Sequence, residues 1–223
     1  MTNIKNYTKG EEAANVATHG FGILFGVAAG AWLLNMAARF DAWAFYCTLT
    51  YVVCMVLSYI TSTTYHATVN PERKALLRKF DHAVIYLHIA GTYTFFTLVS
   101  LRGNGHAFWG WLFFAVSWLA AISGCILSFA GKRTGSKIET ICYIAMGGVI
   151  LLAFSPLFKA FSESGSLLPL WYILAGGASF VVGALFYMFK KVKYMHAVFH
   201  LFVLGGTLFH VLAIASALKG MEL

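Results

Sequence analysis

The sequence predicts an all-α polytopic membrane protein, a seven-transmembrane-helix bundle that forms a single domain over residues 1–223. The chain is 60% hydrophobic and only 11% charged, with a mean hydropathy of +0.74. Such a composition is typical of an integral membrane protein and excludes an ordinary soluble domain. Long uncharged windows and basic residues that concentrate in alternate loops are the other two observations behind this prediction.

Seven windows of the chain contain no Asp, Glu, Lys or Arg. Each is long enough for a helix of about 20 residues, which crosses a bilayer core of about 30 Å. We therefore expect one transmembrane helix in each window. In chain order the windows cover residues 13–38, 42–71, 82–101, 103–131, 140–158, 164–189 and 194–218.

The small and special residues fit helices that pack closely and have no central break. The prolines at Pro71, Pro156 and Pro169 fall in a loop or near helix ends, so we expect no broken helix of the transporter type. Glycines recur every four residues in the first window and predict close helix contact there. The four cysteines lack CxxC spacing and are expected to be core residues rather than disulfides or metal ligands.

The loop charges predict the orientation of the chain. Most of the 16 Lys and Arg residues lie in the N-terminal tail, residues 1–12, and in the loops after the second, fourth and sixth helices. The positive-inside rule then places the N-terminus in the cytoplasm and the C-terminus outside. The net charge of +8 is thus a topology signal, and no nucleic-acid partner is expected. A cleavable signal peptide is not expected either, because the polar tail leads directly into a helix.

A pair of histidines opens the last window. His196 and His200 are one helical turn apart on one face, and imidazole is costly in lipid. Neutral imidazole is a common zinc ligand, and this spacing lets one ion reach both rings. The topology brings His66, at the end of the second helix, to the same side of the membrane. Asp81, at the expected start of the third helix, lies there as well.

These residues suit a zinc site. Three histidines, His66, His196 and His200, leave a fourth tetrahedral position open, as in catalytic zinc sites. Asp81 is the candidate general base for a zinc-bound water. Ser62 lies one turn before His66 and is a candidate to hold that water or a ligand carbonyl.

Structural roles for the same residues are the alternatives. Each histidine could be an interfacial or hydrogen-bonded residue, Asp81 could cap the third helix, and Ser62 could bond a helix carbonyl. Glu11, Asn15 and His19 share one face and are expected to form an amphipathic lead-in to the first helix.

The other histidines and Glu12 differ in their expected positions relative to the zinc site. Glu12 and His19 are further candidates for neighbours of the site, His82 is expected at the interface, and His88 is expected in the core. His106 lies on the outer side, and His210 is about 21 Å along the last helix from His196. We exclude both from the site.

The motifs in this order resemble the bacterial haemolysin III family, within the progestin and adiponectin receptor superfamily. The pattern runs Glu11-Glu-x-x-Asn15-x-x-x-His19-Gly, Ser62-x-x-x-His66, Lys79-Phe-Asp81-His82, and His196-Ala-x-x-His200. It covers nearly the whole chain. The resemblance implies zinc ligands at His66, His196 and His200, with Asp81 contacting the zinc-bound water and Ser62 as the motif serine. One departure is Phe95, where the family usually has proline.

The resemblance also implies a function and a location. Eukaryotic relatives are linked to hydrolysis of lipid amides, and bacterial relatives to haemolysis or membrane fluidity. We expect a multi-pass protein of the bacterial inner membrane that hydrolyses a lipid amide or ester with zinc, a membrane lipid being its substrate or ligand. The alternatives are a zinc-stabilised membrane sensor without turnover and a pore-forming haemolysin, so enzyme activity stays open at this point.

Overall fold

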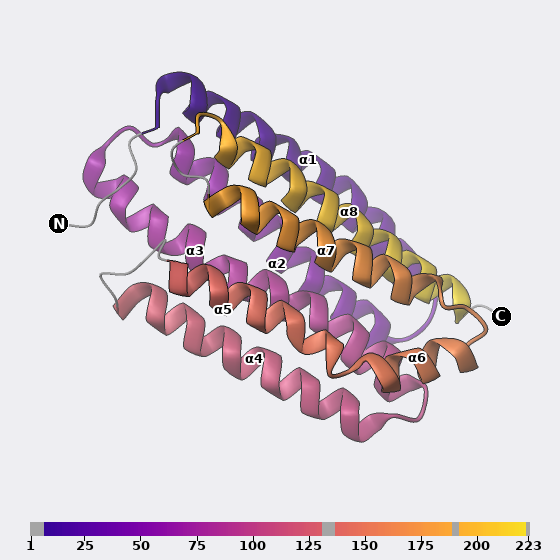
Figure 1. The fold of residues 1–223 in the computed structure, drawn as a ribbon. Coiled ribbons are helices and arrows are strands. Elements are labelled where there is room, and N and C mark those ends of the chain that lie inside the picture. The colour runs from indigo at the N-terminus through magenta and orange to yellow at the C-terminus, as the bar shows by residue number, and fades with distance from the viewer. Residues whose placement is uncertain (1–6, 131–136, 189–191, 222–223) are drawn as a thin grey trace.

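The computed structural model describes residues 7–130, 137–188 and 192–221, and helices joined by short loops make up this part of the chain (Figure 1). Six helices are long and apolar enough to cross a membrane, or up to seven spans if a bent pair counts as one. The six are α1 (Lys9–Ala37), α2 (Ala42–Ala67), α3 (Pro71–Phe95), α4 (Ala107–Ala130), α7 (Leu168–Met188) and α8 (Met195–Gly220).

The bent pair occupies the fifth predicted window and corrects the expectation of unbroken helices. Here α5 (Lys137–Gly148) runs into a short 3-10 turn, η2 (Val149–Leu151), and then α6 (Phe154–Glu163). The two halves are bent by 47°. The cause is Pro156, because its ring excludes the carbonyl four residues earlier and its nitrogen has no proton. Pro156 lies in the first turn of α6, where it needs no helical hydrogen bond.

The third helix begins earlier than the charge pattern suggests. Asn70 caps it by accepting a hydrogen bond from the Arg73 amide at 3.0 Å, and Pro71 takes the first helical position. Asp81 therefore lies well inside α3, so the alternative that it caps this helix is wrong. Directly after Phe95, the helix continues as a π-helical segment, η1 (Phe96–Leu101).

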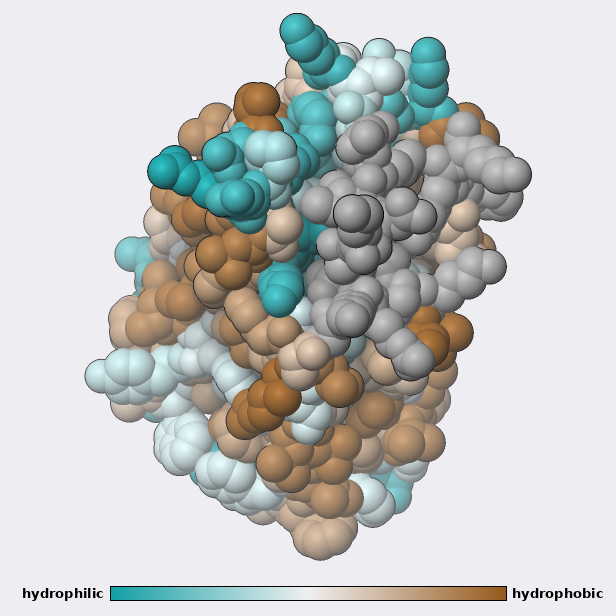
Figure 2. Space-filling model, turned by 90° about the vertical axis from the view of Figure 1, so that its left-hand side faces the viewer, coloured by the Kyte–Doolittle hydropathy of each residue, from teal (hydrophilic) through white to brown (hydrophobic). Residues whose placement is uncertain are grey.

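The helices pack as a bundle whose outer surface is apolar. In Figure 1, α1, α8 and α7 lie side by side, and α3 lies between α2 and α4. Large hydrophobic side chains of α1 and α4 are exposed, such as Leu24 and Leu119. Figure 2 shows hydrophilic residues gathered toward the top, with hydrophobic surface below. The start of α1 and the end of α8 lie at opposite ends of the bundle (Figure 1).

Close packing between α1 and α2 depends on glycine, as expected. A Cβ atom on Gly22 would lie 2.6 Å from the Tyr59 ring, and one on Gly30 would lie 2.5 Å from Val52. Cys47, Cys54, Cys125 and Cys142 are all free. Several loop cations behind the orientation prediction lie outside the described residues; they are Lys5, Lys132, Arg133, Lys190 and Lys191.

Candidate metal centre

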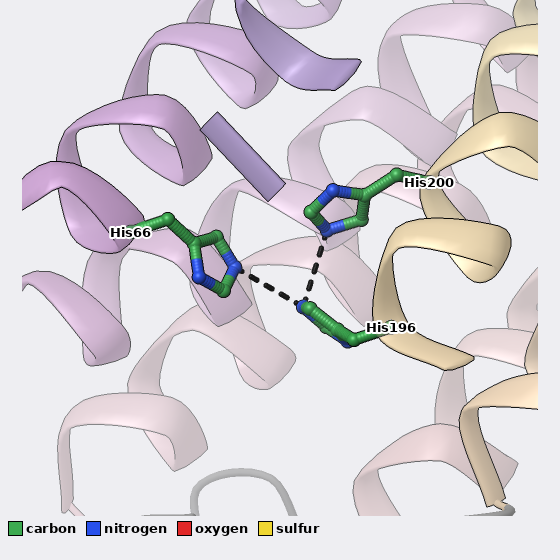
Figure 3. Close-up of side chains that lie close together, drawn as sticks. All are labelled: His66, His196 and His200. Carbon is green, nitrogen blue, oxygen red and sulfur yellow. Dashed lines mark hydrogen bonds between the residues drawn. The ribbon is translucent and has the colours of Figure 1, made fainter. Parts of the chain in front are cut away.

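Three histidines from two helices converge at one end of the bundle. His66 lies in the last turn of α2, and His196 and His200 lie in the first turns of α8. The Nε2 atom of His196 is 3.1 Å from Nε2 of His66 and 3.1 Å from Nε2 of His200 (Figure 3). One ligand atom from each ring lies within 4.8 Å of the others. His66 and His200 are almost fully buried.

A carboxylate fixes the proton of His66. Glu12 Oε2 on α1 lies 2.6 Å from His66 Nδ1. An ionised carboxylate only accepts hydrogen bonds, so Nδ1 carries the ring proton. The Nε2 atom of His66 is then a bare lone pair directed at the other two rings. Carboxylates hold metal-binding histidines in this way in many metal sites.

A hydroxyl fixes the proton of His200 by the same logic. Thr18 Oγ1 donates its single proton to the backbone oxygens of Ala14 and Asn15, at 2.9 and 3.0 Å. It can therefore only accept from His200 Nδ1, 3.0 Å away. The Nε2 atom of His200 is then also a bare lone pair.

Hydrogen bonds alone cannot satisfy this arrangement. The two bare acceptors flank His196 Nε2, and one N–H group on that atom could serve only one of them. A cation satisfies all three lone pairs at once. Two nitrogens bound tetrahedrally to zinc at about 2.0–2.1 Å lie about 3.3–3.4 Å apart, close to the observed 3.1 Å. Three neutral imidazoles therefore fit a zinc ion.

The N-terminal end of α1 holds the start of α8 in place. Glu11 closes a capping box with Thr8, whose amide donates to Glu11 Oε2 at 2.9 Å. The other oxygen of Glu11 accepts from the Tyr194 amide at 3.2 Å. Tyr194 has a left-handed backbone with φ of 62° and precedes α8 directly. The turn that presents His196 is thus bonded to α1.

Lys74 connects Glu12 on α1 to the C-terminal end of α2. Its Nζ atom lies 2.8 Å from Glu12 Oε1. It also donates to the backbone oxygens of Tyr65, His66 and Thr68, at 3.3, 3.4 and 3.0 Å. A cation at a helix C-terminus is favourable because the last carbonyls have no helical partner. Lys74 therefore stabilises both Glu12 and the turn that carries His66.

Ser62 lies on the helix that carries His66, and Asp81 lies on the neighbouring helix α3. Ser62 is buried on α2, one turn before His66. Asp81 is half-buried on α3 and interacts electrostatically with Tyr65 and Tyr187. The Tyr65 ring lies 4.6 Å from the His66 ring, and the Tyr187 ring lies 5.6 Å from the His196 ring. The roles of Ser62 and Asp81 stay predictions.

Two residues from the start of the chain complete the surroundings of the triad. The His19 ring stacks on His200 with 3.5 Å between centroids, and neither of its buried ring nitrogens has a hydrogen-bond partner among the described residues. Tyr7 stacks on His196 at 5.2 Å. Burial raises the pKa of Tyr7 well above its ordinary value, so its hydroxyl stays protonated.

Two expectations about polar residues need correction. Glu11, Asn15 and His19 are buried and face the bundle, so they form part of the site wall rather than an amphipathic lead-in. His82 is buried rather than interfacial, because its Nδ1 atom pairs with Glu139 Oε2 on α5 at 3.2 Å. The reason is shared: neighbouring helices supply partners that a single helix cannot show.

The other histidines separate from the triad as expected. His106 lies 3.8 Å from Glu163, and His88 and His210 are buried elsewhere in the bundle. Within the described part of the chain, the triad is the one group of three potential ligands close enough to share a metal ion. The sequence missed the main role of Glu12, although its spacing from Asn15 and His19 on one helix pointed toward the same face.

Comparisons with known proteins agree with these features. Residues 7–211 match the family described as "Haemolysin-III related". The chain is 39% identical to "Hemolysin-3" of Bacillus cereus, covering 97% of this chain and 98% of that protein. It is 34% identical to "Hemolysin-3 homolog" of Bacillus subtilis (strain 168), covering 90% and 91%. It is also 28% identical to the human "Monocyte to macrophage differentiation factor", covering 92% and 83%. The chain therefore belongs to the Haemolysin-III related family of polytopic membrane proteins.

Proposed function

We propose that His66, His196 and His200 bind zinc and that the protein hydrolyses an amide or ester bond of a membrane lipid. One observation carries the metal: the outer partners Glu12 and Thr18 leave two bare lone pairs beside His196 Nε2. Zinc held by three histidines supplies Lewis-acid chemistry that polarises a carbonyl and acidifies a water molecule.

The protein side chains have separate roles in this proposal. Asp81 takes a proton from the attacking water and returns it to the leaving amine or alcohol. Ser62 donates a hydrogen bond to the substrate carbonyl or the water. Glu12 and Thr18 hold two of the histidine rings by their Nδ1 protons. The balance of this step is hydrolysis: water adds to the carbonyl carbon, and the bond to nitrogen or oxygen breaks.

A membrane lipid is the substrate class that the surroundings favour. The triad lies at one end of a bundle whose outer surface is apolar (Figure 2). A lipid headgroup linkage lies at this depth of a bilayer while its chains stay in the hydrocarbon. We place the protein in the bacterial inner membrane, with the triad end at the cytoplasmic side.

Metal content tests the site directly. We expect His66→Ala and His200→Ala to lose bound zinc, and lipid hydrolysis with it. Asp81→Asn keeps the zinc and loses turnover by about 10²–10⁴-fold, the usual contribution of a general base. Elemental analysis and a lipid-product screen on purified protein measure both, with His106→Ala as the control. Zinc retained in His66→Ala would overturn the ligand assignment.

A second function is favoured by the way the triad joins distant helices. The triad connects α2 to α8, and its outer partners come from α1. Zinc there could act only as a clamp in a membrane sensor without turnover. Chelation then lowers the unfolding temperature while no lipid product forms. For a metal held at 100 times its Kd, the expected loss is about 2.7 kcal/mol, or about 5–11 °C for a chain of this size. An unchanged unfolding temperature after complete zinc removal would exclude the clamp.

A further inference from the structure

A second group of buried polar side chains lies deeper in the bundle, apart from the histidine triad. Its members include His88 on α3 and His210 on α8, which are 7% and 8% exposed. Both rings pack against Phe180 on α7, whose ring centroid lies 6.3 Å from that of His88 and 5.3 Å from that of His210. His210 lies about 15 Å along α8 from His200, near the middle of that helix. Ionisable residues at such depth are rare and usually functional.

His88 presents a bare hydrogen-bond acceptor. Ser58 Oγ donates its single proton to the Met55 carbonyl at 2.7 Å. It therefore accepts from His88 Nδ1, which lies 3.2 Å away. With the ring proton on Nδ1, the Nε2 atom of His88 is a lone pair. This buried atom has no hydrogen-bond partner among the described residues.

His210 presents a second bare acceptor. It forms a hydrogen bond with the backbone of Ile173 on α7, and its ring packs against Gly176, where a side chain would collide with it. A ring nitrogen can only donate to a carbonyl oxygen, so Nε2 carries the proton. The Nδ1 atom is then a lone pair, again without a partner in the described part of the chain.

The neighbouring hydroxyl groups do not supply these nitrogens. Tyr59 donates to Thr207 Oγ1 at 2.7 Å, and Thr207 donates to the Val203 carbonyl at 2.9 Å. The Tyr51 hydroxyl reaches the Thr207 carbonyl only at 3.5 Å, and its ring lies 6.1 Å from that of His88. Two acceptors thus lack donors, while one nearby donor is weakly held.

We propose that His88 Nε2 and His210 Nδ1 together bind a water molecule in the middle of the bundle. Water has two O–H donors, one for each nitrogen, and its oxygen can accept from the Tyr51 hydroxyl. Buried waters typically make about three such hydrogen bonds. A neutral ligand is also far less costly than a cation at this depth. The bridge joins α3 to α8 and does not depend on the metal triad or on the proposed hydrolysis.

A double-mutant cycle on the full-length protein tests the bridge. We expect His88→Leu and His210→Leu each to lower the thermal midpoint by about 2–4 °C, the effect of about one buried hydrogen bond. The double variant should lose no more than the larger single loss, because the second replacement removes a group whose partner is already gone. The control combines His88→Leu with His82→Leu on the same helix, where the losses should add.

Two outcomes of the cycle would overturn the proposal. Losses that add for His88 and His210 would mean that nothing bridges them. A thermal midpoint that rises in either single variant would mean that the replaced ring nitrogen binds no water molecule. The coupling should also be equal at pH 6 and pH 9 and unaffected by a chelator. Coupling lost at pH 9 would indicate a shared proton, and coupling lost on chelation a metal ion, and either would replace the water.

A spectroscopic measurement on the unchanged protein decides the matter if the variants fail to fold. Solid-state NMR on protein with 15N-labelled histidine can follow magnetisation from water to each ring nitrogen. We expect transfer to the unprotonated nitrogens of both His88 and His210. Absence of transfer to both rings would overturn the bound water.

Discussion

At the scale of single residues, the site is defined by which ring nitrogen of each of His66 and His200 carries the proton. Glu12 and Thr18 do not touch the proposed metal position, yet they decide that His66 and His200 present lone pairs there. Glu12 is held in turn by Lys74 at 2.8 Å. The network explains why a carboxylate and a lysine lie beside a buried triad: each neutralises or orients the next group.

The first prediction concerns Glu12. We expect Glu12→Gln to lower zinc affinity by about 10–100-fold, because a neutral amide holds the His66 Nδ1 proton less firmly than a carboxylate. Competition with a zinc indicator measures the change. Glu72→Gln, at an exposed site in the first turn of α3, is the matched control. Equal affinity in both variants would show that the carboxylate does not orient the ring.

At the scale of helices, close packing and one bend shape the bundle. Gly22 and Gly30 let α1 lie directly against α2, which brings Glu12 and Thr18 on α1 within reach of His66 and His200. Pro156 lies at the bend between α5 and α6. The histidines themselves stand at a helix C-terminus and a helix N-terminus, which lie at the same end of the bundle.

A packing prediction follows for the α1–α2 contact. We expect Gly22→Ala to destabilise the protein by about 1–3 kcal/mol, since the new methyl group would overlap the buried Tyr59 ring. Gly20→Ala is the matched control, because nothing lies within 4 Å of its Cβ position, and it should be neutral or stabilising. Thermal unfolding in detergent measures both. A harmless Gly22→Ala would contradict the close contact.

At the scale of the whole molecule, the number of spans decides whether the two ends of the chain lie on the same side of the membrane. If the bent pair crosses once, there are seven spans, and the two ends of the chain lie on opposite sides of the membrane. The described helices agree, because α1 begins and α8 ends at opposite ends of the bundle (Figure 1). By the positive-inside rule, the basic loops predict that the triad end faces the cytoplasm.

Reporter fusions test this orientation. We expect alkaline phosphatase fused after Leu223 to be active, because this enzyme folds only outside the cytoplasm, and a fluorescent protein fused at the N-terminus to emit. The same phosphatase placed in the loop after α2 should be inactive. Activity at the loop and silence at the C-terminus would invert the topology and place the triad outside.

The sequence by itself determined the class of protein, the number of windows and the three histidines. Hydrophobic length and loop charge are local properties, so they can be summed along a chain without knowing which helices touch. The spacing of His196 and His200 is equally local. The bend at Pro156 was within reach of the sequence, yet a proline near a window end did not reveal that the helix breaks there.

Only the tertiary structure decided which acid forms a hydrogen bond with the triad and which partners the other buried polar side chains have. Glu12 rather than Asp81 bonds a histidine directly, because α1 packs against both α2 and α8. The pairing of His82 with Glu139, and the contact of both His88 and His210 with Phe180, likewise join helices far apart in the sequence. Proton positions follow from such partners. The sequence identifies the histidines, and only the packed helices show that Nε2 is the unprotonated nitrogen of His66 and of His200.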